Sequence, residues 1–142
     1  MDNSHPLTYS FTVHGNDFSS AGDASVQVKK ILRNIGFDAD VIRRVSIAMY
    51  EAEINMVIHA GGGIAEVNVS PDKIVLVLTD KGPGIADIEL AMSEGYSTAP
   101  DNIRSLGFGA GMGLPNIKRY SDDLKIESKL GEGTKLTITI KP

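Results

Sequence analysis

Hydrophobic residues occupy every second position from Leu7 to Val13, and hydroxyl side chains lie between them. This alternation is typical of a strand that buries one face. Residues 15–17 interrupt it with glycine, asparagine and aspartate, which favour turns. The pattern therefore predicts a strand near the N-terminus that ends before residue 15.

The spacing of hydrophobic residues then changes to three and four, as in an amphipathic helix. We expect the first helix to be capped by Ser19 or Ser20 and to end at Ile35, before Gly36. Its buried stripe should consist of Val28, Ile31, Leu32 and Ile35.

A second helix is expected over about residues 41–60, with Asp38 or Asp40 as its cap. Its core face should include Val45, Ala48 and Ala52. The three consecutive glycines at 61–63 should end it, because glycine is the commonest residue beyond a helix C-terminus.

Two strands are expected next, over residues 64–70 and 73–80, with Pro71-Asp72 as the turn between them. The second strand is hydrophobic on both faces from Ile74 to Leu78. We therefore expect it to be central in the sheet and covered on both sides, at least in part.

Residues 86–93 suit a short helix, and the glycine-rich residues 95–113 have little periodicity, which predicts a mobile loop. A helix over about residues 114–121 and strands over 124–129 and 134–140 should follow. This order predicts one α/β domain with a two-layer sandwich fold. Its mixed, mostly antiparallel sheet should carry helices mainly on one face.

Composition supports one globular domain over residues 1–142, with 42% hydrophobic and 23% charged residues. The net charge of −4 argues against nucleic acid as the main partner, because phosphate backbones require a basic surface. The absence of cysteine excludes disulfides and thiol chemistry. No segment reaches the about 18 apolar residues of a membrane span and no signal peptide is evident, so we expect a cytoplasmic protein without membrane contact.

Candidate chemistry begins on the second helix. Glu51, Asn55 and His59 recur every four residues and therefore share one helix face. A carboxylate and an amide about one turn apart can supply a general base and a ligand for a divalent cation. A solvated polar face is the alternative for Glu51 and Asn55, and His59 alternatively caps the carbonyl groups at the helix end.

A second candidate is Asp80, which follows the predicted central strand and precedes Gly82 and Gly84. A carboxylate at the mouth of a buried strand needs hydrogen-bond donors, and the exocyclic amine of adenine is one. Glycines allow close approach of a flat ligand to the backbone. A simple surface turn is the alternative.

The third candidate is the glycine-rich segment from Gly107 to Gly113, which precedes a predicted helix. Backbone N–H groups there and the positive helix end suit phosphate oxygens. Neither the dinucleotide-binding glycine pattern nor a P-loop occurs in the chain, which disfavours both common nucleotide folds.

Four short motifs in this order resemble the nucleotide-binding boxes of the gyrase, chaperone, histidine-kinase and MutL ATPases, the GHKL superfamily with the Bergerat fold. They are Glu51-x-x-x-Asn55, Asp80-x-Gly82-x-Gly84, Gly111-Met112-Gly113-Leu114 and Gly131-Glu132-Gly133-Thr134. Within this superfamily, the chain is most similar to small bacterial anti-sigma-factor kinases and stress-pathway switch kinases. The segment 99–106 leaves the choice between these two groups open.

The resemblance implies that ATP and Mg²⁺ bind and that Glu51 is the base for a substrate hydroxyl. It further implies that Asn55 is a Mg²⁺ ligand and that Asp80 and Thr134 recognise adenine, directly and through water. Gly82 and Gly84 would let the base dock. The remaining nucleotide-binding residues implied are Gly109, Ala110, Gly111, Met112, Gly113 and Leu114, within a lid over the phosphates formed by residues 95–113.

The resemblance also implies a serine/threonine protein kinase that phosphorylates a small antagonist protein of the anti-anti-sigma type and regulates transcription by partner switching. A sigma factor or another regulator is an implied further partner, and a homodimer is one open alternative. Two other functions compete with this one. They are an ATP-gated protein-binding module with little transferase activity and the detached catalytic domain of a histidine kinase.

Overall fold

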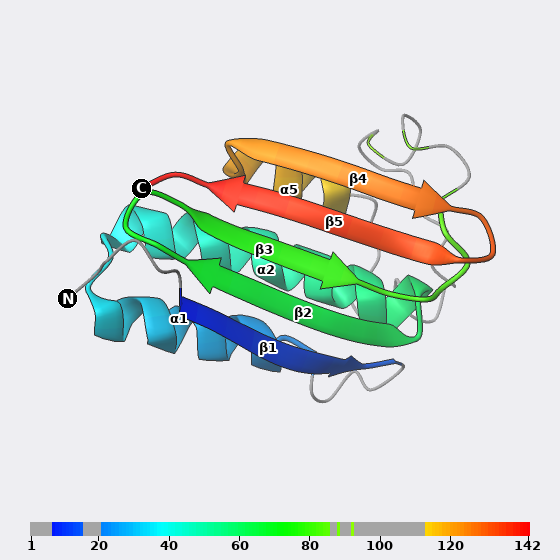
Figure 1. Ribbon diagram of the computed structural model, residues 1–142, viewed down its shortest axis with the longest axis horizontal. Coiled ribbons are helices and arrows are strands. Elements are labelled where there is room, and N and C mark those ends of the chain that lie inside the picture. The colour runs from blue at the N-terminus through cyan, green and yellow to red at the C-terminus, as the bar shows by residue number, and fades with distance from the viewer. Residues whose placement is uncertain (1–6, 16–20, 86–87, 89–91, 93–112) are drawn as a thin grey trace.

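The computed structural model describes residues 7–15, 21–85, 88, 92 and 113–142. Within these residues a five-stranded sheet has the order β1-β2-β3-β5-β4, and each pair of neighbours is antiparallel. The helices lie together on one face of the sheet, behind it in Figure 1. The predicted two-layer α/β sandwich is therefore confirmed. The elements are β1 (Leu7–His14), α1 (Asp23–Ile35), α2 (Ala39–His59), β2 (Gly62–Val69), β3 (Ile74–Thr79), α5 (Gly113–Tyr120), β4 (Asp123–Lys129) and β5 (Gly133–Ile140).

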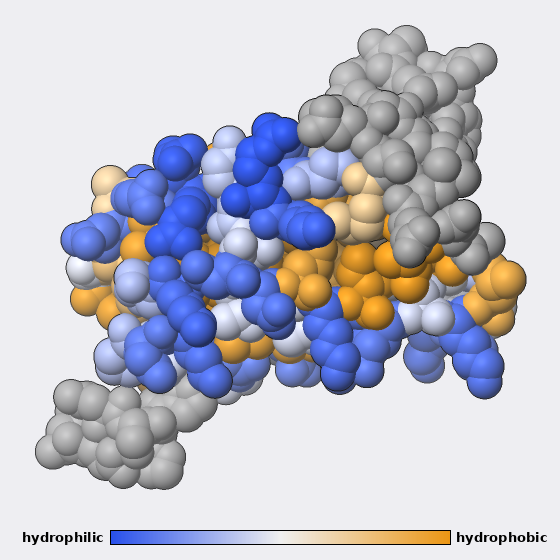
Figure 2. Space-filling model, turned by 90° about the horizontal axis from the view of Figure 1, so that it is seen from above, coloured by the Kyte–Doolittle hydropathy of each residue, from blue (hydrophilic) through white to orange (hydrophobic). Residues whose placement is uncertain are grey.

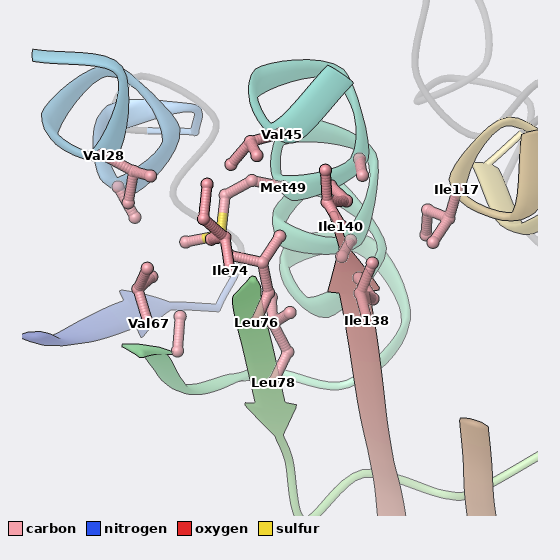
Figure 3. Packing of buried hydrophobic residues seen from close by; sticks show 14 of the residues in the cluster. Val28, Val45, Met49, Val67, Ile74, Leu76, Leu78, Ile117, Ile138 and Ile140 are labelled. Atoms are coloured by element: carbon pink, nitrogen blue, oxygen red, sulfur yellow. The ribbon is translucent and has the colours of Figure 1, made fainter. Parts of the chain in front are cut away.

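The core lies between the sheet and the helix layer (Figure 3). Val45 and Met49 of α2 face the sheet, while Val28 comes from α1 and Ile117 from α5; all four are fully buried. Burying a side chain of this size contributes about 1.5–3 kcal/mol. Because α2 packs against α1, α5 and the sheet, its position fixes that of every polar residue it carries.

β3 is the central strand, as predicted, and its side chains Ile74, Leu76 and Leu78 are buried beneath the helices. Val75 and Val77 point to the other face and are half-buried. The expected partial cover of this second face comes from side chains on the paired strands β2 and β5, not from a described helix.

The predicted cap of the first helix and one member of its predicted buried stripe are wrong, whereas its predicted end at Ile35 is confirmed. α1 begins at Asp23 after Gly22, whose φ of 97° is left-handed, whereas Ser19 and Ser20 lie outside the described residues. Ile35 is 45% exposed and does not join the buried stripe. Ile35 lies in the last turn of the helix. Gly36, which follows it, adopts a φ of 104° and redirects the chain.

β2 begins at Gly62, two residues earlier than predicted, so Gly62 and Gly63 belong to the strand. A side chain at Gly63 would collide with the carbonyl of Thr79 and with Met56 of α2. The glycines therefore allow β2 to start directly beneath the helix that precedes it. The Pro71-Asp72 turn between β2 and β3 is confirmed, and the backbone N–H of Ser70 donates to the carbonyl of Lys73 at 3.0 Å.

Little of the segment between β3 and α5 is described. Ile88 is helical and accepts a hydrogen bond from the backbone N–H of Met92 at 3.0 Å, in line with the predicted short helix over residues 86–93. The predicted mobile loop over 95–113 lies outside the described residues, except for Gly113. No helix in the described ranges combines the length and the hydrophobicity that a membrane span requires.

Candidate functional site

Two of the candidate residues, Asp80 and Thr134, lie at one end of the sheet, where β3 ends and β5 begins, on the right in Figure 1. Because β3 and β5 are antiparallel neighbours, the end of one lies beside the start of the other. This arrangement brings Asp80 and Thr134 together, although they are far apart in the sequence. The backbone N–H of Asp80 donates to the carbonyl of Thr134 at 3.0 Å.

The side chain of Asp80 is held by the backbone around it. Its Oδ1 accepts hydrogen bonds from the N–H groups of Gly82 at 2.9 Å and Thr134 at 3.2 Å. Within the described part of the chain, Oδ2 has no hydrogen-bond partner. One oxygen is thus used to orient the carboxylate, and the other is left as an acceptor at the edge of the core.

Thr134 belongs to a second small network. Its Oγ1 lies 2.9 Å from Oγ of Ser128, which also accepts a hydrogen bond from the backbone N–H of Ile85 at 2.7 Å. Sequence reasoning missed Ser128. The available signal was its place in β4, where it continues the core-facing alternation of Leu124 and Ile126 with a polar side chain.

The glycines after Asp80 are required by the packing of the chain itself. A Cβ on Gly82 would lie 2.7 Å from Cα of Ala60, at the end of α2. Gly84 has a φ of 79°, and a Cβ there would lie 2.5 Å from the carbonyl oxygen of Lys129. Both glycines let residues 80–85 pass close to their neighbours, and their predicted contact with a ligand stays a prediction.

Glu51 and Asn55 lie half-buried on α2, one turn apart. Burial raises the pKa of the Glu51 carboxyl above 4.5, and a hydrogen bond from the side chain of Asn116 acts in the opposite direction. Asn116 belongs to α5 and was given no role by the sequence analysis. The contact therefore connects a predicted catalytic residue to the helix that follows the glycine-rich segment.

α5 packs against α2. The guanidinium of Arg43 on α2 sits 5.5 Å from the ring centre of Tyr120, the last residue of α5. The two helices run in opposite directions in Figure 1. Asn55, one turn beyond Glu51, is consequently on the side of the N-terminus of α5.

The start of α5 itself suits an anion. Its first residue is Gly113, and Leu114 is buried with 8% exposure, which anchors this turn to the core. Pro115 in the first turn costs no helical hydrogen bond, because N–H groups there have no partner within the helix. The predicted phosphate-binding residues Gly109, Ala110, Gly111 and Met112 lie outside the described residues.

His59 is the last residue of α2.

Glu53 is the polar residue that sequence reasoning missed most clearly. It is 2% exposed, and its carboxylate accepts backbone hydrogen bonds from Gly22 at 3.0 Å, Ala24 at 3.2 Å and Ser25 at 3.0 Å. The signal was its position four residues from Met49, where a hydrophobic residue is expected. Glu53 of α2 thereby binds the start of α1. In the sequence it lies two residues from both Glu51 and Asn55.

The described residues contain no cluster of three or more His, Asp or Glu side chains that could hold a metal ion. Mg²⁺ at nucleotide sites is usually held by one or two protein groups together with phosphate oxygens and water. The half-buried amide of Asn55 on α2, the helix against which α5 packs, fits that donor set. A preformed cage of carboxylates is not required.

Hydrophobic residues also reach the surface on this side of the molecule. Figure 2, which looks onto the side that carries β4 and α5, shows them as a band of orange residues flanked by hydrophilic ones. Among the residues packed against the core but only partly buried are Ile85, Met92, Leu124 and Ile126. Hydrophobic walls with a few placed polar groups are characteristic of small-molecule sites.

Comparison with known proteins agrees with this architecture. The chain is 30% identical over 112 residues to the serine/threonine-protein kinase RsbT of Bacillus subtilis. The aligned region covers 76% of this chain and 78% of the relative. It is 33% identical over 124 residues to an anti-sigma F factor of Clostridium beijerinckii, with 83% of both chains covered.

A solved structure of the RsbU and RsbW domains of Rv1364c from Mycobacterium tuberculosis superposes with a TM-score of 0.63 at 17% identity. The match covers 97% of this chain and 32% of that one, and at this identity it supports the fold alone. The family model described as "Histidine kinase-like ATPase domain" matches residues 17–140. These residues include all the described helices and every strand except β1, and the chain therefore belongs to the histidine kinase-like ATPase domain family.

Proposed function

We propose that this protein is an ATP-dependent serine/threonine protein kinase of the anti-sigma-factor and switch type, acting in the cytoplasm. It transfers the γ-phosphate of ATP to a Ser or Thr of a small antagonist protein and thereby changes which protein it holds. The relatives, a serine/threonine-protein kinase and anti-sigma F factors, support this class. The observation that carries the proposal is that Glu51 and Asn55 lie half-buried one turn apart on α2, the helix against which α5 packs.

Adenine recognition is assigned to the residues around Asp80. With Oδ1 engaged by two backbone N–H groups, Oδ2 is oriented to accept a hydrogen bond from the exocyclic amine. Thr134 would assist through water, next to Ser128. Gly82 and Gly84 would leave the plane of the base free of side chains.

The phosphates are assigned to the region between Asn55 and α5. The amide oxygen of Asn55 would hold Mg²⁺, and when bound this ion neutralises charge on the phosphate oxygens. Backbone N–H groups at Gly113 and Leu114, at the positive end of α5, would contact phosphate oxygens. The proposal extends these contacts to Gly109, Ala110, Gly111 and Met112.

Glu51 is assigned the role of the base. The hydroxyl oxygen of the substrate forms a bond to the γ-phosphorus as the bond from that phosphorus to the bridging oxygen breaks, and ADP leaves with the bridging oxygen. The carboxylate of Glu51 accepts the hydroxyl proton. Burial favours this role, because a carboxylate whose pKa is raised is a stronger base than one in water.

The partners follow from the same class. The phosphate acceptor is proposed to be an antagonist protein of the anti-anti-sigma type, and the protein exchanged for it a sigma factor or another regulator. A homodimer is included in the proposal as the assembled form. Nucleic acid and membrane surfaces are not among the proposed partners.

A pull-down from the source organism in the presence of MgATP, followed by mass-spectrometric mapping of phosphosites, tests the proposal. A Ser or Thr of a recovered protein should carry phosphate with the wild-type protein and much less with Glu51→Gln. Binding of MgATP without any phosphate transfer would identify an ATP-gated binding module instead. Failure to bind MgATP at all would overturn the proposal.

A further inference from the structure

The polar residues at the site end of the sheet form a row across three neighbouring strands. Ser128 of β4 and Thr134 of β5 lie directly opposite each other, and Asp80 follows the end of β3, on the other side of β5. All three continue the core-facing alternation of their strands, which is otherwise largely hydrophobic. A polar row at the edge of a hydrophobic face is suited to a ligand that covers it.

Ser128 is held in place by backbone groups outside this row. Its Oγ accepts a hydrogen bond from the N–H of Ile85 at 2.7 Å and donates one to the carbonyl of Gly133 at 3.3 Å. The segment that carries Ile85 is itself fixed, because the N–H of Gly131 donates to the carbonyl of Pro83 at 2.9 Å. The hydroxyl of Ser128 therefore has little freedom to rotate.

The hydroxyl of Thr134 depends on Ser128 for its orientation. Its Oγ1 lies 2.9 Å from Oγ of Ser128 and has no other hydrogen-bond partner among the residues that the structure describes. A hydroxyl has one hydrogen and two lone pairs. Since Ser128 gives its hydrogen to Gly133 and one lone pair to Ile85, its second lone pair is left to accept the hydrogen of Thr134. The lone pairs of Thr134 are then free to accept hydrogen bonds.

We propose that Ser128 is a positioning residue that holds the hydroxyl of Thr134 as an acceptor for the water that bridges it to adenine. This inference rests on the proposed function, in which Asp80 and Thr134 recognise the base. Ser128 need not touch the nucleotide. It keeps Thr134 in one rotamer before ATP arrives, so that binding does not have to order this side chain.

A double-mutant cycle on the affinity for MgATP, measured by calorimetry, tests this role. Ser128→Ala should weaken binding by about three- to tenfold, the equivalent of one hydrogen bond between neutral groups. Thr134→Val has a similar shape but no hydroxyl, and in that background Ser128→Ala should weaken binding by less than about twofold. Ser70→Ala is the matched control, because the hydroxyl of Ser70 also makes two hydrogen bonds, to Asp72 and Lys73, but at the opposite end of β3. It should leave the affinity unchanged in both backgrounds.

The preference for one base over another separates positioning from a general structural defect. GTP has a carbonyl where ATP has its exocyclic amine, and this oxygen would be repelled by the carboxylate of Asp80. GTP should therefore bind weakly and without the bridge to Thr134. Its affinity, measured by competition, should change by less than about twofold in Ser128→Ala, so the preference for ATP should fall by about three- to tenfold. An equal loss for both nucleotides would contradict the positioning role.

Amide hydrogen exchange gives a second readout that needs no nucleotide. The N–H of Ile85 should exchange faster in Ser128→Ala, which removes its acceptor, and at the wild-type rate in Thr134→Val and Ser70→Ala. Unchanged exchange at Ile85 in Ser128→Ala, or an equal loss of ATP affinity in both Thr134 backgrounds, would overturn the positioning role alone. Unchanged ATP affinity in Thr134→Val would instead remove Thr134 from the adenine site of the proposed function.

Discussion

Oε2 of Glu53 lies 3.0 Å from the backbone nitrogen of Gly22, the residue that precedes α1. Gly22 has no side chain to cap the helix, and its φ of 97° leaves the first N–H groups of α1 pointing toward α2. The carboxylate of Glu53, with 2% exposure, takes the place of that cap. A residue in the middle of α2 thus supplies the hydrogen-bond acceptor for the first backbone N–H groups of α1.

Replacement of Glu53 by Ala should destabilise the protein by about 3–5 kcal/mol, because three buried N–H groups would lose their acceptor. Urea unfolding measured at neutral pH is the appropriate experiment. Glu66→Ala, on the exposed face of β2, is the control and should change the free energy of unfolding by less than about 0.5 kcal/mol. Equal stability of the two variants would contradict the capping role.

Replacement of Asp80 by Asn should weaken ATP binding by about 10- to 150-fold, the equivalent of losing a hydrogen bond to a charged group. An amide can present its NH₂ group where the exocyclic amine of adenine requires an acceptor. Isothermal titration calorimetry measures the effect, with Asp123→Asn on the exposed part of β4 as the control. Unchanged affinity in Asp80→Asn would remove this residue from the proposed site.

The pH dependence of stability should reveal the burial of Glu51. Burial raises its pKa in the folded protein, so the ionised form is the less stable one in the fold. The contribution of Glu51 to stability is fully present below the unfolded value of about 4.5 and is lost as the pH rises through the raised folded pKa. Glu51→Gln, which stays uncharged, should therefore have a higher Tm than the wild type at neutral pH.

This difference in Tm should disappear when both proteins are melted below about pH 4.5, where the wild-type carboxyl is also protonated. Other carboxyls titrate in the same range, but they are shared by the two proteins and cancel in the comparison. A lower Tm for Glu51→Gln at neutral pH would show that the ionised carboxylate stabilises the fold.

Gly82→Ala should destabilise the protein by about 1–3 kcal/mol, because the added Cβ would lie 2.7 Å from Cα of Ala60 and the backbone of one segment must shift. Gly131→Ala is an informative comparison. Gly131 has a φ of 78° with open space around it. The alanine substitution there should therefore lower the free energy of unfolding by about 1–2 kcal/mol, through backbone strain alone. Only Gly82→Ala should also weaken ATP binding, and calorimetry distinguishes the two.

Local patterns in the sequence were sufficient to determine most of the elements. Alternation from Leu7 to Val13 and the hydrophobic run of β3 predicted strands, because period two matches a pleated backbone. The ordered motifs around Glu51, Asp80, Gly113 and Thr134 were sufficient to predict the family that the comparisons confirm. The strand patterns depend on residues that are close in the sequence, and the family resemblance depends on the order of the motifs along the chain.

Tertiary structure decided which polar groups meet. Glu53 binds the start of α1, and Ser128 lies beside Thr134, and each contact joins different elements. The burial of Glu53 is stable only because donors arrive from another helix, and a hydrophobic pattern contains no information about a distant donor. The exposure of Ile35 has the same origin, since the periodicity of α1 places it on the buried stripe but the neighbouring elements do not cover the last turn.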